Sequence, residues 1–324
     1  MPRKKAAARP PKADAPEIGT VPLKAGGKPH PELGLGLWSL GRWERDDETR
    51  TRTTADHALA RGVRWFDTAE VYGTGRSERL LGDVLSRGLV APKETFVTTK
   101  VSWEHLRAAQ VKAAVVGSLQ KLARTSVDLV LVHAPDHRVP IAETMGALEA
   151  LWKEGKMGAI GVSNFSVEQL AEARAALHET DIVVNQVVYN LFDRQDGDGV
   201  LEYCRKNGIL IEAYTPLMRG ILAGRYLDGT PPSPEVRRFA HDLMDPNRYR
   251  TIVGAAREIR EVAAEAKVPM ASIALHWLRR RGAAVLFGAS RPEQIDELLE
   301  AWSRRPSDAV LDRADAIAQG ATRA

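Results

Sequence analysis

The sequence predicts a single-domain α/β fold in which eight parallel strands close into a (β/α)8 barrel, also called a TIM barrel. Short apolar runs alternate with stretches of helical periodicity over most of the 324 residues, as expected for parallel strands joined by helices. An open doubly wound sheet is disfavoured, because no Gly-x-Gly-x-x-Gly motif opens a helix after the first strand. The glycine-containing run GLGLW instead lies within that strand.

The predicted strands follow one another at a fairly regular spacing. They are ELGLGLW from Glu32, VRWFDTA from Val63, TFVTTKV from Thr95, VDLVLVHA from Val127, AIGVSNF from Ala159, DIVVNQVVYN from Asp181, ILIEAYTP from Ile209 and AAVLFGAS from Ala283. Eight strands that alternate with helices favour the closed barrel.

Helices are predicted between these strands. Over residues 141–152, Met145, Leu148 and Leu151 fall on one helical face together with Trp152. Ser77 indicates the start of another helix. Ser166 and the glutamine three residues later indicate a helix that begins with a capping box.

The stretch over residues 217–282 is much longer than the other connections. It contains GRYLDGTPPSPE, which predicts a loop, and then two helical segments. Because it follows a strand, we expect it to lie at the active-site end of the barrel.

The composition is ordinary for a soluble globular enzyme, with 44% apolar and 27% charged residues. Much of the net charge of +4 comes from Arg3, Lys4, Lys5, Arg9 and Lys12. We therefore predict a basic, disordered tail over residues 1–28 and the barrel over residues 29–324. The tail does not by itself indicate a specific nucleic-acid partner.

The sequence has no apolar run of about 20 residues that would span a bilayer, and its N-terminus lacks the apolar core of a secretory signal. We therefore expect a cytoplasmic protein with no membrane partner. Cys204 is the only cysteine, which excludes an intrachain disulfide and a cysteine-based zinc site. Its place on a predicted helix favours a buried, inert thiol.

Asp67, Tyr72, Lys100 and His133 each lie at or just after the end of a predicted strand. The carboxyl ends of the strands are where a parallel barrel places its chemistry. Each residue has an ordinary structural explanation when taken alone: a turn cap, a surface aromatic, a paired lysine or a core histidine. Their joint occurrence after the second, third and fourth strands favours a shared catalytic role.

These four side chains together could transfer a proton to a carbonyl oxygen. The ammonium of Lys100 is expected to lower the pKa of the Tyr72 phenol, which is otherwise about 10. Asp67 would compensate the buried charge of Lys100, and His133 would hydrogen-bond the carbonyl oxygen. Because no side chain donates hydride, a nicotinamide cofactor is implied.

Several segments resemble the aldo-keto reductase superfamily, in the expected order and over nearly all of residues 32–294. They are FDTAEVYGTGRSERLLG, VTTK, DLVLVHAPD, IGVSNF, NQVVYN, AYTPLMRGILAGRY and GASRPEQIDE. The resemblance implies an oxidoreductase that reduces aldehydes and ketones to alcohols with NADPH, or alternatively with NADH. It also implies that Asp67, Tyr72, Lys100 and His133 form the catalytic tetrad, with Tyr72 as the general acid.

The same resemblance implies which residues bind the cofactor. These are Ser163, Asn164, Gln186, Tyr214, Thr215, Leu217, Arg219, Gly220, Ser290, Arg291, Gln294 and Glu297. The first three correspond to partners of the nicotinamide carboxamide, and Tyr214 to the aromatic residue that stacks on the nicotinamide ring. Leu217, Arg219 and Gly220 correspond to the loop over the pyrophosphate. The segment from Ser290 would bind the 2′-phosphate at a helix N-terminus.

Two departures from the family pattern bear on the choice of cofactor. Leu298 stands where many relatives have asparagine, and Phe287 stands where many have proline. Both lie on the adenosine side, so the preference for NADPH over NADH stays open.

Trp38 and Trp103 lie near strand ends and could line an apolar substrate pocket, with core packing as the alternative. We expect no metal, because Asp136 and His137 lack a third ligand at suitable spacing. We expect a small-molecule carbonyl substrate and either a monomer or a small homo-oligomer.

Two other functions stay open at this point. The same fold can serve as a non-catalytic, cofactor-sensing regulatory protein, as in the potassium-channel auxiliary subunits that resemble this family. Alternatively, Lys100 could form a Schiff base in an aldolase-type barrel.

Overall fold

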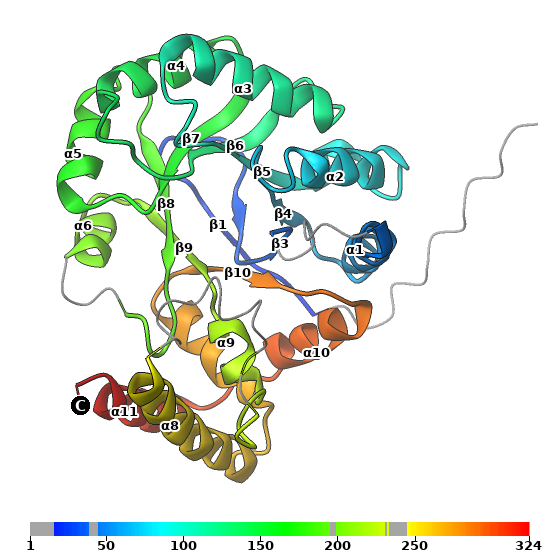
Figure 1. Cartoon of the computed structure of the whole chain (residues 1–324), viewed down its shortest axis with the longest axis vertical. Coiled ribbons are helices and arrows are strands. Elements are labelled where there is room, and N and C mark those ends of the chain that lie inside the picture. Colours follow the sequence, from blue (N-terminus) through cyan, green and yellow to red (C-terminus); the bar gives the residue numbers. More distant parts are fainter. Residues whose placement is uncertain (1–15, 39–44, 195–198, 231, 233–244, 324) are drawn as a thin grey trace, which may run out of the picture.

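The computed structural model describes residues 16–38, 45–194, 199–230, 232 and 245–323. Eight strands form a closed barrel in the order β10-β3-β4-β5-β6-β7-β8-β9 (Figure 1). Their bounds are β3 Leu33–Gly36, β4 Trp65–Asp67, β5 Phe96–Val101, β6 Val127–Val132, β7 Met157–Ser163, β8 Ile182–Val188, β9 Leu210–Tyr214 and β10 Ala284–Gly288. All neighbouring pairs are parallel. The predicted fold class and the eight predicted strands are confirmed.

Helices surround the barrel on its outside (Figure 1). They are α1 Arg45–Ala60, α2 Arg76–Ser86, α3 Ala108–Lys121, α4 Ile141–Lys153, α5 Val167–Ala175, α6 Val200–Lys206, α8 Pro246–Glu265, α9 Met270–Arg280, α10 Pro292–Ser303 and α11 Asp308–Arg323, with 3-10 turns η1 Pro92–Glu94 and η2 Met218–Ala223. Helices α8 and α9 are the two segments predicted in the long connection. No helix of the described ranges is long and apolar enough to cross a membrane.

Both predicted helices are present, but only Ser166 caps its helix as predicted. The Ser166 hydroxyl accepts a hydrogen bond from the Gln169 amide, while the Ser166 amide donates to the Gln169 side chain, so the capping box forms. Ser77 does not cap α2. Gly75 makes the entry to that helix with a φ of 80°, and the Ser77 hydroxyl accepts instead from Thr68.

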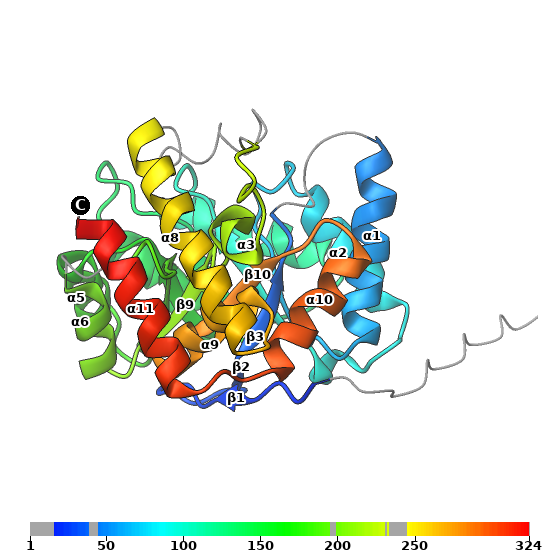
Figure 2. The ribbon, with the colours of Figure 1, turned by 90° about the horizontal axis from the view of Figure 1, so that it is seen from below.

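Residues 16–28 are not part of a tail, which corrects the predicted boundary at residue 28. β1 Thr20–Val21 pairs antiparallel with β2 His30–Pro31, and this hairpin crosses one end of the barrel (Figure 2). Leu23 joins the apolar cluster inside the barrel, and Lys24 forms a 2.6 Å ion pair with Asp181 just before β8. The hairpin folds here because it covers apolar side chains at the N-terminal ends of the strands. Residues 1–15 lie outside the described residues.

Apolar side chains fill two regions, one inside the barrel and one between the strands and the helices. The Cys204 thiol is buried in the outer region, as predicted. Trp65 is completely buried in the inner region, where its indole nitrogen donates to the Thr98 hydroxyl at 3.0 Å. Gly34 on the neighbouring strand makes room for this indole, because a Cβ at position 34 would lie 2.2 Å from two of its ring carbons.

We expect Gly34→Ala to lower the free energy of unfolding by about 1–3 kcal/mol, because a rigid, enclosed indole cannot move away from the added methyl group. Urea unfolding followed by circular dichroism measures the loss. The matched control is Gly146→Ala in α4, where nothing lies within 4 Å of the new Cβ. That variant should gain about 0.5–1 kcal/mol because alanine favours the helix. Equal effects of both substitutions would contradict this account of the barrel interior.

Candidate active site

Neighbouring parallel strands bring the predicted catalytic residues to one rim of the barrel. Asp67 ends β4, Lys100 lies near the end of β5, and His133 directly follows β6. Tyr72 lies in the turns between β4 and α2, where its amide donates to the carbonyl of Ala69 at 3.0 Å. The pairing of β4 with β5 and of β5 with β6 thus assembles residues that are up to 66 positions apart in the chain.

Lys100 is the centre of this group. Its ammonium forms an ion pair with Asp67 Oδ1 and donates to the carbonyl oxygen of Thr68 at 3.0 Å. It also donates to the hydroxyl of Tyr72 at 3.4 Å. The Lys100 side chain has no exposed surface. The structure therefore brings Asp67, Lys100 and Tyr72 into one hydrogen-bonded chain.

Burial dominates the electrostatics of Tyr72. It raises the pKa of the phenol to about 12, although the nearby ammonium of Lys100 acts in the opposite direction. Lys100 thus acts on the Tyr72 pKa in the expected direction, but the net pKa lies above the ordinary value. The reason is that desolvation of the phenolate outweighs the attraction of one ammonium, and Asp67 partly cancels that attraction.

The pKa values of Asp67 and of Lys100 are both raised in this buried pair. Burial raises the pKa of Asp67, and Lys100 opposes that shift only partly. Burial alone would lower the pKa of Lys100, but Asp67, Tyr72 and Glu212 together outweigh it and the net shift is upward. Lys100 is therefore an ammonium at neutral pH.

His133 is a neutral imidazole in this environment. Burial, and then the charge of Lys100, lower its pKa to about 3. Its ring lies edge-on to Tyr72 at 5.5 Å and to Trp103 at 5.7 Å between ring centroids. Its Nδ1 is buried and has no hydrogen-bond partner among the described residues. His133 thus joins the other three residues at the rim, as predicted.

The predicted nicotinamide-binding residues Ser163, Asn164 and Tyr214 also lie next to one another. The Asn164 side chain donates to the Ser163 hydroxyl at 2.9 Å and accepts from the Tyr214 hydroxyl at 3.0 Å. Asn164 has a φ of 61°, a left-handed conformation that asparagine tolerates better than most residues. Tyr214 ends β9, so its ring is held at the rim.

Gln186 lies deeper than its predicted role requires. Its amide nitrogen donates to Asp67 Oδ2 at 3.0 Å and to Glu212 Oε2. A second oxygen of Glu212 contacts His30 Nε2 at 2.9 Å. The predicted site contained neither Glu212 nor His30. A carboxylate within the apolar run ILIEAY, two positions before Tyr214 and so on the same face of the strand, was the available signal.

The remaining predicted cofactor residues form two groups after β9 and β10. Thr215, Leu217, Arg219 and Gly220 lie in or before η2, which contains several residues with positive φ. Gly220 has a φ of 105° and allows a tight turn against the side chain of Arg225. These residues thus form a compact loop directly after Tyr214.

Ser290, Arg291 and Gln294 lie at the N-terminal end of α10. The Ser290 amide and hydroxyl both donate to Gln294 Oε1, at 2.8 Å and 3.2 Å. The Arg291 guanidinium is largely exposed, with its Nε 3.9 Å from a carboxylate oxygen of Glu293. It is therefore accessible to an anion in solution.

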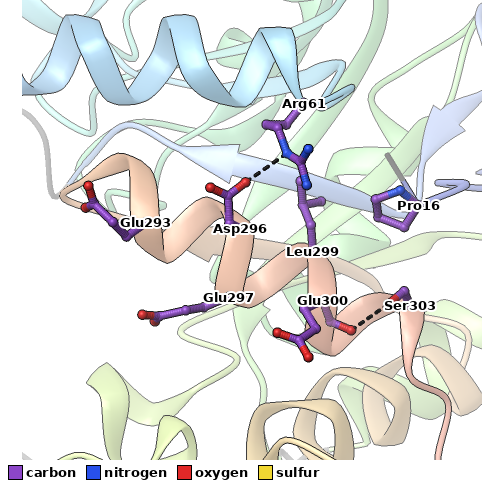
Figure 3. A pocket seen from close by; sticks show the side chains of 8 residues that line it. All are labelled: Pro16, Arg61, Glu293, Asp296, Glu297, Leu299, Glu300 and Ser303. Carbon is purple, nitrogen blue, oxygen red and sulfur yellow. Dashed lines mark hydrogen bonds and ion pairs between the residues drawn. The ribbon is translucent and has the colours of Figure 1, made fainter. Parts of the chain in front are cut away.

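A pocket beside α10 has carboxylates as half of its lining residues (Figure 3). Its residues are Pro16, Arg61, Glu293, Asp296, Glu297, Leu299, Glu300 and Ser303. Asp296 points toward Arg61 and pairs with it at 2.8 Å, whereas Glu297 points away from Arg61. The predicted cofactor residue Glu297 therefore lies in an acidic surface, and the strand-end residues are not part of this pocket.

Trp38 and Trp103 have 39% and 41% of their surface exposed, so the alternative that they are core residues is wrong. Both stand at the rim, directly after β3 and β5. Within the described ranges, no three His, Cys, Asp or Glu side chains form a group that could hold a metal ion.

The half-buried Tyr72 hydroxyl is bonded to the buried Asp67 and Lys100 pair beside a neutral imidazole, at the carboxyl ends of parallel barrel strands, and such an arrangement can transfer a proton. The sequence model of the aldo/keto reductase family matches residues 32–319, and the chain belongs to this family. Members of the family are oxidoreductases that act on small carbonyl compounds and use nicotinamide cofactors.

Individual relatives match along most of their length. Aldo-keto reductase YhdN of Bacillus subtilis is 32% identical over 291 residues, which cover 85% of this chain and 87% of the relative. Aflatoxin B1 aldehyde reductase member 2 of Rattus norvegicus is 31% identical over 316 residues, covering 90% and 85%. The structure of glycerol dehydrogenase AKR11B4 from Gluconobacter oxydans superposes with a TM-score of 0.81 at 29% identity, covering 92% and 94%.

We expect the His133 imidazole to stay neutral as the pH falls from about 8 to about 4, since its pKa is about 3. The unfolded chain takes up a proton near the ordinary value of about 6.5, so His133 lowers the stability of the fold as the pH falls below that value. Nitrogen NMR of labelled histidine measures the titration, with the urea-unfolded chain as the control. A midpoint near 6.5 in the folded protein would contradict the described environment.

Proposed function

We propose that this protein reduces aldehydes and ketones to alcohols, with NADPH as the cofactor and with Asp67, Tyr72, Lys100 and His133 as its catalytic residues. The observation that carries the proposal is the chain of contacts from Asp67 through Lys100 to the Tyr72 hydroxyl, beside the His133 ring. It puts a proton donor and a neutral imidazole at the rim of the barrel. A bound nicotinamide cofactor would supply the hydride for the carbonyl carbon.

Tyr72 is suited to be the proton donor. With a pKa of about 12, its phenol keeps its proton at neutral pH. The carbonyl oxygen gains negative charge as hydride reaches the carbon, and it then takes the proton from Tyr72. The ammonium of Lys100, 3.4 Å from the hydroxyl, stabilises the phenolate that is left. Neutral His133 would hydrogen-bond the carbonyl oxygen and orient it.

The polar groups at the rim fit a nicotinamide cofactor. The Tyr214 ring is held by Asn164 in a position from which it can stack on a planar ring. The Gln186 amide nitrogen is already bonded to two carboxylates, so its oxygen is the atom that can accept from a carboxamide. The Tyr214 ring supports a bound nicotinamide at this rim, whereas Gln186 lies deeper and could contribute only its side-chain oxygen.

The cofactor preference depends on the N-terminal end of α10. The exposed guanidinium of Arg291 and the helix N-terminus favour a phosphate, which supports NADPH. The carboxylates of Glu293 and Glu297 on the same helix oppose a phosphate, which keeps NADH as the alternative cofactor.

Two observations argue against a Schiff base on Lys100. The nitrogen is buried and bonded to Asp67, Thr68 and Tyr72, and the upward shift of its pKa keeps it protonated. An ammonium has no lone pair with which to attack a carbonyl carbon. We further propose a cytoplasmic location, a small-molecule substrate, and no nucleic-acid or membrane partner.

Tyr72→Phe should lower the turnover number for a simple aldehyde about 100- to 10,000-fold, because the proton donor is removed. Cofactor affinity, measured by quenching of tryptophan fluorescence, should stay unchanged. Tyr249→Phe is the matched control, since the hydroxyl of this α8 residue is buried and has no hydrogen-bond partner within the part of the chain that the structure describes. If the native protein binds the cofactor tightly yet turns over no aldehyde, ketone or sugar, the reductase proposal fails and a cofactor-sensing role is favoured.

Arg291→Ala should weaken NADPH binding about 10- to 100-fold, which corresponds to the loss of a charge-assisted hydrogen bond. NADH binding should change little, because NADH has no 2′-phosphate. Arg304→Ala, at the other end of α10, controls for the loss of one positive charge. Equal weakening of both cofactors by Arg291→Ala would place the phosphate site elsewhere.

A further inference from the structure

A continuous row of polar side chains runs through the interior of the barrel, from the hairpin at the N-terminal end to the Tyr72 hydroxyl. Its members between these ends are His30, Glu212, Gln186, Asp67 and Lys100, and each has at most 3% of its surface exposed. Polar groups buried this deeply are destabilising unless every one is paired. The hydrogen-bond partners of each side chain in this row therefore show which neighbour it positions.

His30 fixes one end of the row. Its Nδ1 lies 2.8 Å from the carbonyl oxygen of Pro31, which can only accept, so Nδ1 carries a hydrogen. Its Nε2 lies 2.9 Å from Glu212 Oε1. The ring packs edge-on against Trp65 and Phe96, at 4.3 Å and 4.5 Å between centroids. These contacts allow the imidazole only one orientation. The imidazole in turn holds Oε1 of Glu212 in place.

Gln186 joins the two carboxylates. Carboxylates only accept hydrogen bonds, so the two hydrogens of its amide nitrogen point to Glu212 Oε2 and to Asp67 Oδ2. The other oxygen of Asp67 is the one that pairs with Lys100. Each carboxylate thus uses one oxygen for a basic side chain and the other for the same amide.

We propose that Glu212 is a positioning residue for the proton-donating pair: held by His30, it fixes the Gln186 amide and through it the Asp67 carboxylate, which keeps Lys100 beside the Tyr72 hydroxyl. This inference rests on the proposed function of Tyr72 and Lys100. Among the described residues Glu212 forms no hydrogen bond with either of them. It acts through the shared Gln186 amide and, through its charge, on Lys100, and both effects are separable from ordinary barrel packing.

The charge of Glu212 supports the same conclusion. The titratable groups that interact with Lys100 are Asp67 and Tyr72 from β4 and the turns after it, His133 after β6, and Glu212 and Tyr214 from β9. Asp67 is the main cause of the raised pKa of Lys100, and Glu212 adds to it. Removing the charge of Glu212 therefore favours loss of the ammonium proton at a lower pH.

The test is Glu212→Gln, which keeps the shape of the side chain and removes its charge. We expect the turnover number for an aldehyde to fall about tenfold or more, with KM values for aldehyde and cofactor within about twofold of the native ones. The alkaline limb of the pH profile of kcat/KM should move to lower pH. Glu78→Gln is the matched control: it neutralises a completely buried carboxylate of α2 that pairs with Lys121 outside the barrel. It should lower the melting temperature and leave kcat and the pH profile unchanged.

Glu212→Gln removes the carboxylate that pairs with the buried His30, and this loss could prevent folding. A second variant therefore keeps the test decisive. His30→Gln with Glu212→Gln removes both ionisable groups together, which avoids an unpaired buried charge. It should show the same loss of kcat. In a Gln186→Leu background, Glu212→Gln should have no further effect on kcat, since the link is already broken.

Crystal structures of the variants give a readout that does not depend on turnover. In Glu212→Gln we expect the Asp67 carboxylate to rotate and the Lys100 Nζ to Tyr72 hydroxyl distance to exceed its present 3.4 Å. Unchanged positions, or a native kcat and pH profile with only a lower melting temperature, would overturn the positioning role. A native protein with no carbonyl turnover would refute the proposed function, and the crystallographic comparison would still decide this inference.

Discussion

The buried ammonium of Lys100 is the constraint on which the rest of the structure depends. Taking such a charge out of water is costly by several kcal/mol, and a single imperfect partner does not offset it. Here the charge is compensated by Asp67, by the Thr68 carbonyl and by the Tyr72 hydroxyl. These groups come from β4 and the turns after it, so the register of β4 against β5 has to be right for Lys100 to be buried at all.

The same constraint extends to the opposite end of the barrel. Asp67 is itself desolvated, and its second oxygen is satisfied by Gln186, whose amide is shared with Glu212 and so with His30. His30 lies in the hairpin that covers the N-terminal end of the barrel. The segment that completes the apolar interior therefore also completes the hydrogen bonds of the candidate active site. Stability and chemistry depend on the same interior contacts.

The rim is built differently from the interior. Trp38 and Trp103 are exposed there, the loop after β9 has several left-handed residues, and Arg291 faces solvent. Such groups can change without disturbing the buried pairs, because few of their contacts reach the barrel interior. Family membership thus gives the reaction class, and we propose that the side chains of the rim select the substrate.

The sequence by itself determined the fold class, the eight strands and the position of Asp67, Tyr72, Lys100 and His133 at strand ends. Hydrophobic periodicity and the common edge of parallel strands are local or general properties, so they can be derived without coordinates. The capping box at Ser166 is local in the same sense.

Only the tertiary structure decided which side chains pair inside the barrel. Gln186 meets Asp67 across 119 positions and His30 meets Glu212 across 182, and no local pattern encodes such distances. The direction of the Tyr72 pKa shift was likewise undetermined, because it is the difference between desolvation and the attraction of Lys100. The sequence predicts residues 16–28 as part of a basic tail. In the structure they are folded, because Leu23 packs into the apolar interior of the barrel, which is built from residues far along the chain.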